Sequence, residues 1–302
     1  MKSNNRKSGR RKWLVTGCIA MISGLYISSL LEAQDTTTDT TIRFIEQVKM
    51  YDAALNKFQY KYGALPGDYP DADTMLPRCV GGGEESPCKP LSSSAGDGVI
   101  GNKDFIQGLA TPISTTSVPA SSAADETVLF WQHLGKADLI AFGDNDLKSN
   151  QELSWGVTHP EALVGGGLTV GFAFGEPLPK HLSPASTGMA GVLLVLTTSP
   201  KGDVDLTAAG QQVLTPHNAA RVDRKLDDGN PSSGFVQAYG SPYCFYAASV
   251  VNQRLGKPDT WTNSKIAEFY KERVSKDQKA VKYSEEYTGK ECGLVMRLWH
   301  AP

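Results

Sequence analysis

The sequence predicts an α+β protein in which a long N-terminal helix packs on an antiparallel β-sheet. A helical pattern of apolar residues comes first, over 36–62, and strand-like segments come later, with helices between them. This order is typical of α+β proteins, whereas regular alternation would indicate a parallel sheet. The chain has 302 residues, 40% hydrophobic and 21% charged. That composition fits a globular protein and excludes disordered, collagen-like and multi-span membrane chains.

The net charge of −2 combines two unlike parts. Residues 1–12 hold six basic residues and no acidic one, so the rest of the chain has 24 basic against 32 acidic residues. An acidic body excludes a generally basic nucleic-acid-binding protein, and we expect no nucleic-acid partner. The basic start is typical of a cytoplasmic segment beside a membrane.

Residues 13–31 form a run of 19 residues without a charge. A helix of that length spans about 28 Å, close to the thickness of a bilayer core. We therefore expect a single transmembrane helix in the bacterial inner membrane, with residues 1–12 in the cytoplasm and the C-terminal body in the periplasm. Two alternatives stay open: a signal peptide cut after Ala33, and a lipoprotein signal ending at Cys18. All three export the body.

Cysteine use agrees with export. Four cysteines lie outside the uncharged run: Cys79, Cys88, Cys244 and Cys292. They allow three pairings, of which sequence proximity favours Cys79 with Cys88 and Cys244 with Cys292. No C-x-x-C spacing occurs and no histidine lies near either pair, so we expect structural disulfides in the periplasm rather than zinc.

Residues 32–62 are expected to form an amphipathic stalk helix. Its apolar residues recur at spacings of three and four: Ile42, Ile45, Val48, Tyr51, Leu55, Phe58 and Tyr62. This spacing places them on one face of a helix, and Gly63, followed by Pro66, marks its end. Residues 63–302 would then form one globular head tied by the disulfides.

The head is expected to begin with a loop over 63–123 and to continue with helices and strands. Three helices are predicted: 126–141 with Asp125 as the N-cap, a helix that starts at Thr215-Pro216 and ends at Gly229, and a polar helix near 264–277. Apolar and β-branched runs predict five strands: 161–176, 191–198, 234–239, 243–251 and 292–299.

Four stretches resemble, in order, a group of bacterial type IV pilin-like proteins. They are 58–68 with Ala64-Leu65-Pro66-Gly67-Asp68, then Gly96-Asp97-Gly98, then 130–140 with Trp131, His133 and Leu134, then 223–234 with Asp223, Asp227, Asp228 and Gly229. The resemblance covers most of the chain. It implies a long helix packed on an antiparallel sheet. It also implies assembly through that helix into a pilus or a type II secretion pseudopilus, with other pilin-like subunits or secretion-system components as partners.

The N-terminal processing motif departs from that family. Gly9 stands at about the distance where the family's peptidase cuts, but Arg10 replaces the usual Phe and Leu14 replaces the Glu of the fifth mature position. In such assemblies the Glu pairs with a neighbour's N-terminal amine inside the membrane, where an unpaired charge is costly. The departure implies a minor, tip or non-polymerising member.

Two patterns raise the question of a cofactor. The six residues 96–101 match G-x-G-x-x-G, but the strand and helix that a nucleotide site needs on either side are missing, so a glycine-rich turn is expected. Asp144-Asn145-Asp146 starts like a calcium loop, but Lys148 and Ser149 stand where an EF-hand requires an oxygen ligand and a glycine. A looser calcium site at Asp144 and Asp146 stays open.

The second candidate calcium site is the acidic group Asp223, Asp227 and Asp228. Asp223 and Asp227 share a helix face at i, i+4 and repel each other unless a cation lies between them. The alternative is a capped helix end with a turn at Asp228-Gly229. We expect no other cofactor.

The residues do not predict an enzyme. The five histidines show no metal spacing such as H-E-x-x-H, and His133, beside Trp131, is expected to be packed or hydrogen-bonded rather than a base. Ser186 lacks the G-x-S-x-G pattern and a designated His and Asp. We expect a non-enzymatic structural component. The alternatives are a periplasmic or surface adhesin-like binding protein on the same fold, and an exported hydrolase.

Overall fold

The computed structural model describes most of the expected head and the end of the expected stalk. The described residues are 40–79, 88–90, 95–101, 125–143, 147, 151–201, 204–256, 260–277 and 281–298. The predictions for 1–12, 13–31, Gly9 and the pair Asp144 and Asp146 fall outside the described residues. None of the helices described has the length and hydrophobicity that a membrane crossing requires.

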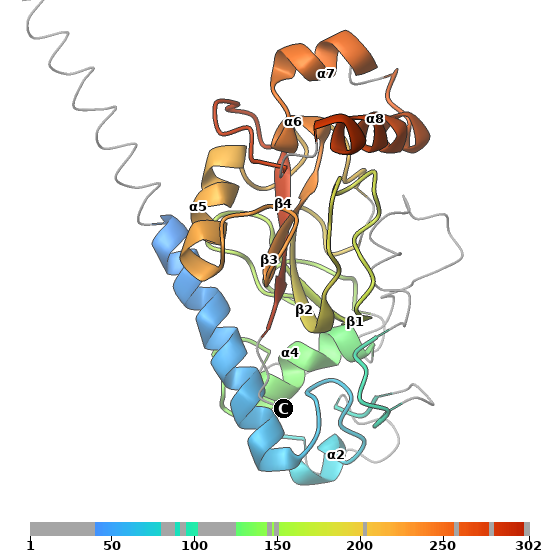
Figure 1. Cartoon of the computed structure of the whole chain (residues 1–302). Helices are drawn as coiled ribbons and strands as arrows, with labels where there is room; N and C mark the ends of the chain where they lie inside the picture. Colours follow the sequence, from blue (N-terminus) through green and yellow to red (C-terminus); the bar gives the residue numbers. More distant parts are fainter. Residues whose placement is uncertain are drawn as a thin grey trace, which may run out of the picture.

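A four-stranded antiparallel sheet forms the centre of the protein, in the order β1-β2-β4-β3 (Figure 1). Its strands are β1 (Gly167–Phe174), β2 (Ala190–Thr197), β3 (Val236–Gly240) and β4 (Cys292–Arg297). Each neighbouring pair runs antiparallel. The predicted α+β class with an antiparallel sheet is therefore confirmed.

Strand β2 is buried on both faces of the sheet. Val192, Leu194 and Leu196 belong to the larger of two apolar clusters, and Leu193 and Val195 belong to the smaller one. Successive side chains of a strand point to opposite faces, so a strand covered on both sides needs apolar residues at every position. This requirement explains the continuous apolar run from which the strand was predicted.

The helices are gathered around the sheet, and the larger cluster joins them to it. They are a helix over 40–62, α2 (Ala72–Met75), α4 (Glu126–Lys136), α5 (Pro216–Leu226), α6 (Pro242–Phe245), α7 (Ala248–Leu255) and α8 (Asn263–Asp277). Helix 40–62 runs along one side of the sheet. α2 and α4 lie at one end of the molecule and α6, α7 and α8 at the other (Figure 1).

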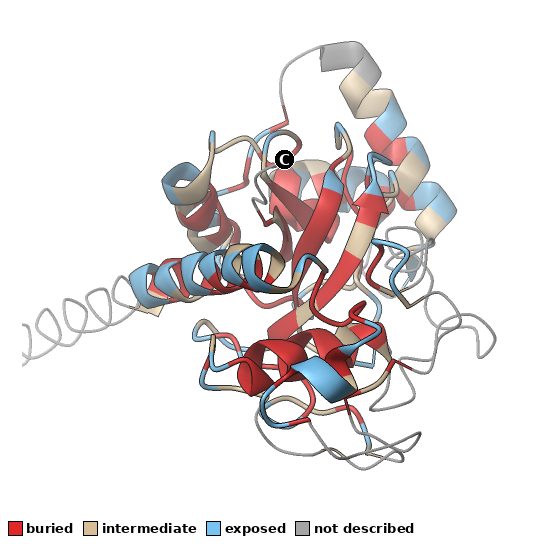
Figure 2. Cartoon of the chain, turned by 90° about the horizontal axis from the view of Figure 1, so that it is seen from below, coloured by how far each residue is buried: buried red, intermediate tan, exposed pale blue. Residues whose placement is uncertain are grey.

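Helix 40–62 lays one face on the head and leaves the other face exposed (Figure 2). The predicted stripe is correct from Ile45 to Phe58, but Ile42 is 47% exposed and Phe44 is fully buried in its place. Three residues turn a helix by about 300°, so repeated spacings of three drift off one face. Phe44 lies four residues before Val48, a spacing that keeps both side chains on the buried face of the helix.

The predicted helix over 126–141 begins where expected but ends five residues early, at Lys136. The Asp125 side chain caps its start by accepting a hydrogen bond from the Thr127 N–H at 2.8 Å. At its end Asp138 has φ 59°, and the Leu139 N–H donates to the Leu134 carbonyl at 3.0 Å. This bond and the left-handed Asp138 form a Schellman cap, which ends the helix.

The predicted strand over 243–251 is wrong, because α6 and α7 occupy that segment. Ser241 is the N-cap of α6 and accepts from the Tyr243 N–H at 3.2 Å, with Pro242 at the first helical position. Serine before proline is a helix-start signal, and it outweighs the β-forming aromatic residues that follow. The predicted Thr215 cap of α5 is confirmed by a 3.2 Å bond from the Asn218 N–H.

Both favoured disulfides are present. Cys79 is joined to Cys88 and Cys244 to Cys292, with Cα–Cα distances of 5.9 and 5.3 Å. The second bond ties α6 to the first residue of β4, and both of its cysteines are fully buried. It therefore links the helical end of the head directly to the central sheet.

Candidate functional site

Three of the four pilin-like stretches meet in one place, which we name the loop–helix junction. It consists of residues 64–68, the turn 95–101, Cys88 of the first disulfide, and α4. Helix α4 is buried on nearly every side (Figure 2). The side chains of His133 and Glu126 find hydrogen-bond partners within the protein, whereas the Gln132 amide and the Trp131 indole N–H are buried without one among the described residues.

His133 connects three segments of the junction. It lies fully buried on α4, and its Nδ1 accepts a hydrogen bond from the Gly67 N–H at 2.9 Å. Its Nε2 lies 2.8 Å from the Cys88 carbonyl oxygen and therefore donates to it. Burial lowers the pKa of His133 to about 4. The expectation of a packed, hydrogen-bonded histidine is confirmed by this geometry.

Gly67 fits against α4 because it has no side chain. Its φ is +90°, and a Cβ there would lie 2.3 Å from the Glu126 carbonyl oxygen. Any other residue would strain the backbone and push the loop off the helix. This close approach is what brings the Gly67 N–H within reach of the His133 ring.

Asp68 closes the glycine-rich turn. One carboxylate oxygen accepts from the Gly96 N–H and the other from the Gly98 N–H, the second at 2.8 Å. The Gly101 N–H donates to the Glu126 side chain at 2.8 Å. The backbone amides that a phosphate would need are therefore bound to carboxylates of the chain itself, which supports the turn expected here instead of a nucleotide site.

The burial of His133 makes stability depend on pH. The unfolded chain binds a proton near the ordinary His pKa of 6.5, but the folded chain does so only near 4. Stability from this group is therefore complete above pH 6.5 and is lost as the pH falls toward 4, by about 3 kcal/mol. We expect the stability advantage of the native chain over His133→Gln to shrink by about that amount between pH 7 and 4, as measured by urea unfolding.

Comparison with His133→Gln cancels the titration of other groups, because both proteins share them. A stability difference that stays constant from pH 7 to 4 would contradict the buried, neutral histidine. The glutamine side chain has both an N–H donor and a carbonyl acceptor, but it does not titrate.

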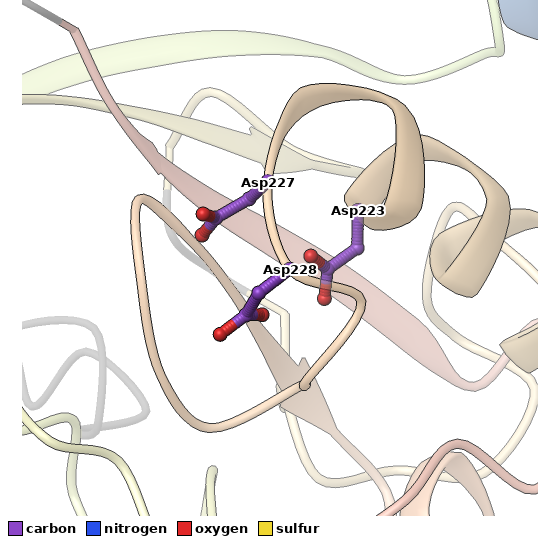
Figure 3. A group of neighbouring side chains, drawn as sticks. All are labelled: Asp223, Asp227 and Asp228. Carbon is purple, nitrogen blue, oxygen red and sulfur yellow. The ribbon is translucent and has the colours of Figure 1, made fainter.

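The fourth pilin-like stretch forms an acidic cluster at the end of α5. Asp223 projects from the last turns of the helix, and Asp227 and Asp228 follow where it ends (Figure 3). One carboxylate oxygen from each lies within 4.8 Å of the others. The acidic group expected from the sequence is therefore present, and the structure adds what each of its carboxylates binds.

Each carboxylate of the cluster already accepts hydrogen bonds from the chain. Asp223 accepts from the Gly229 N–H at 2.9 Å and the Tyr283 hydroxyl at 2.7 Å. Asp227 accepts from the N–H groups of Phe235 and Val236, the second at 3.0 Å. Through these bonds the cluster closes the loop between α5 and β3.

Asp228, the exposed member, holds the same loop from outside. It accepts from the Asn230 N–H at 2.7 Å and the Ser233 hydroxyl at 2.9 Å. Gly234 approaches Asp227 so closely that a Cβ would lie 1.9 Å from its carboxylate. The loop is thus built around the aspartates.

Asp223 is electrostatically strained at neutral pH. Burial raises its pKa to about 6, and the neighbouring charges of Asp228 and Asp227 add to that rise, against the lowering effect of its hydrogen bonds from Tyr283 and Gly229. A proton on Asp223 is therefore one way in which the cluster relieves its repulsion, and a bound cation would be another.

Removing the Asp227 side chain should open the loop. Asp227→Ala leaves two backbone N–H groups without their acceptor, so we expect it to cost about 2 kcal/mol of unfolding free energy. Asp228→Ala is the matched control: it removes a carboxylate one residue away that is exposed, and should cost less than half as much. Equal losses in urea unfolding would contradict the loop-closing role of Asp227.

Asp227→Ala also helps to test whether the acidic cluster binds calcium. Because the three carboxylates are engaged by donors of the chain, we expect millimolar calcium to leave the melting temperature of the full chain unchanged. A calcium-dependent rise that magnesium does not reproduce and that Asp227→Ala abolishes would establish a calcium site instead.

Two structural partners were not found from the sequence. Tyr283 lies 60 residues from Asp223, and no local pattern connects them. The second is Gln237, whose side chain accepts a hydrogen bond from the Ser186 hydroxyl at 2.7 Å; that hydroxyl also accepts from the Leu178 N–H at 2.9 Å. These bonds give the Ser186 hydroxyl a structural role between the loop and β3.

Both groups of residues therefore use their polar atoms to hold backbone segments in place. The carboxylates and the histidine close loops, and Ser186 bonds to an amide rather than to an imidazole. No protein-family model, curated protein or solved structure matches the chain.

Proposed function

We propose that the protein is a non-enzymatic, pilin-like or pseudopilin-like structural component of a bacterial pilus or type II secretion system, and a minor or atypical member of its assembly. Residues 13–31 would anchor it in the inner membrane, with residues 1–12 in the cytoplasm and the head in the periplasm. Its partners would be other pilin-like subunits or secretion-system components.

The observation that carries this proposal is the outer face of helix 40–62. Large hydrophobic side chains stand exposed on it: Ile42 at 47%, Met50 at 44% and Tyr60 at 95%. These residues lie on a helix whose opposite face is fully used by the head. Exposed apolar side chains on one helix face offer contact points for another helix.

The charges of this face support the same proposal. Its exposed charged residues are mostly basic: Arg43, Lys49, Lys57 and Lys61 against Glu46. The chain beyond residue 12 is acidic on balance. A basic helix face and an acidic head on each copy are complementary, which favours association of one subunit's helix with its neighbour.

The junction and the acidic cluster support it in a different way. Their residues form the pilin-like stretches, and they hold loops against α4 and α5 without presenting a reactive group. A head in which these residues hold loops in place is better suited to presenting a surface and packing against other subunits than to catalysis.

Photo-crosslinking in living cells tests the proposal. A benzoylphenylalanine at Ala53, on the exposed face of helix 40–62, should give a crosslinked product that contains a second pilin-like chain. The control position is Lys225 on α5, which is exposed on the head. Products of equal size and yield from the two positions, or none from Ala53, would overturn the proposal.

A further inference from the structure

A cleft of about 440 Å³ opens at the C-terminal end of helix 40–62. Gln59 and Gly63 line it from the helix end, Asp68 and Gly98 from the loop–helix junction, and Phe172 from β1. Its volume is in the range of sites that bind small molecules or single side chains. The loop-closing roles described above do not account for this space.

The helix end gives the cleft a negative potential. The Gly63 N–H donates to the Gln59 carbonyl at 2.8 Å, and with φ +68° Gly63 stops the helix. The last carbonyl groups of a helix lack intrahelical donors and carry the negative end of its dipole. A cation placed beside them is stabilised.

Asp68 adds a full negative charge to the same cleft. Its carboxylate accepts only from the turn amides, and none of the ion pairs among the described residues includes it. Burial, more than the nearby Asp97, raises the pKa of Asp68. The charged form would therefore gain from a cation in the cleft.

One lining residue of the cleft is aromatic. Phe172 lies on the same face of β1 as Phe174, and their rings contact each other at a centroid distance of 5.2 Å. Phe174 is 51% exposed. An aromatic ring attracts a cation through its face and packs against an alkyl chain.

Lys61, near the end of helix 40–62, contacts an aromatic ring. The Lys61 ammonium lies over the Tyr62 ring, 4.8 Å from its centroid. The cleft thus combines a helix C-terminus, a buried carboxylate and an aromatic side chain.

We propose that this cleft binds a primary alkylammonium group, with the ammonium beside Asp68 and the helix end and the alkyl chain along Phe172. The source of that group is either a lysine side chain of another protein or a free diamine. The proposal does not depend on filament assembly, because it concerns a site within one chain.

The test uses the isotope-labelled full chain in detergent micelles, with NMR detection of amide groups. Three probes are titrated: Nα-acetyl-lysine methylamide, its Nε-acetylated form, and cadaverine. We expect saturable shifts at Gly63, Gly98 and the Gln59 side chain with the charged lysine probe, and at least about tenfold weaker binding of the acetylated form, which keeps the alkyl chain but loses the charge. Binding of the charged lysine probe together with cadaverine identifies a lysine side chain as a possible source. Binding of cadaverine without the lysine probe identifies a free diamine.

Two variants locate the binding. Gln59→Lys brings a positive charge to the cleft and should weaken binding by about tenfold or more. Tyr60→Lys adds the same charge to the same helix turn, at a side chain that is 95% exposed, and should leave binding within about twofold. Equal affinities for the charged and acetylated probes, equal effects of the two variants, or no saturable shift would overturn the proposal.

Discussion

Replacing Phe58 by alanine should lower the free energy of unfolding by about 4 kcal/mol. Phe58 is fully buried where helix 40–62 meets the loop–helix junction. Its ring lies 4.6 Å from Tyr62, 6.1 Å from Tyr69 and 6.1 Å from the His133 ring, measured between centroids. The substitution leaves a cavity at a point where the helix, the loop and α4 all make contact, so the surroundings can fill it only in part.

Tyr60→Ala is the matched control for Phe58→Ala. It removes an aromatic ring two residues away on the same helix, from a side chain that is 95% exposed. We expect a change of less than about 0.5 kcal/mol. Urea unfolding of the full chain in detergent measures both. Losses of similar size would show that helix 40–62 does not pack on the head as described.

Removing the Cys244–Cys292 disulfide should be about as damaging as Phe58→Ala. The bond closes a loop with a sequence separation of 48 residues, and the chain-entropy relation assigns about 4 kcal/mol to a loop of that length. We expect the double replacement Cys244→Ala with Cys292→Ala to lose this stability, because the unfolded chain gains freedom and α6 loses its link to β4.

The Cys79–Cys88 disulfide provides the comparison. Its sequence separation is nine residues, for which the same relation gives about 2.5 kcal/mol. The paired alanine variants of the two disulfides should therefore differ in unfolding free energy. A larger loss for the shorter loop would show that the bonds act mainly through local contacts rather than through chain entropy.

The sheet and most helix starts were predictable because their causes are local. A strand buried on both faces requires an unbroken apolar run, and β2 has one. Asp125 and Thr215 are caps that act within three residues of their position. Where local signals competed, as after Ser241, the cap and the proline outweighed the aromatic residues.

The site was predictable only in part. The acidic cluster was found because its aspartates lie within six residues of each other, but Tyr283 comes from a distant segment. The bond from Gly67 to His133 spans 66 residues, and only the pilin-like resemblance connected the two stretches. The cleft had no signal in the sequence, because Phe172 and Gln59 meet only when the sheet and the helix pack together.

We propose that the head remains attached to a membrane segment and acts as a pilin-like structural component. N-terminal sequencing of the protein purified from its native membrane tests it most directly. We expect a chain that keeps residues 13–31 and begins either at Met1, as a static anchor, or at Arg10, after cleavage at Gly9. A chain that begins at Gln34 would show that a signal peptide had been removed after Ala33, and would contradict the claim.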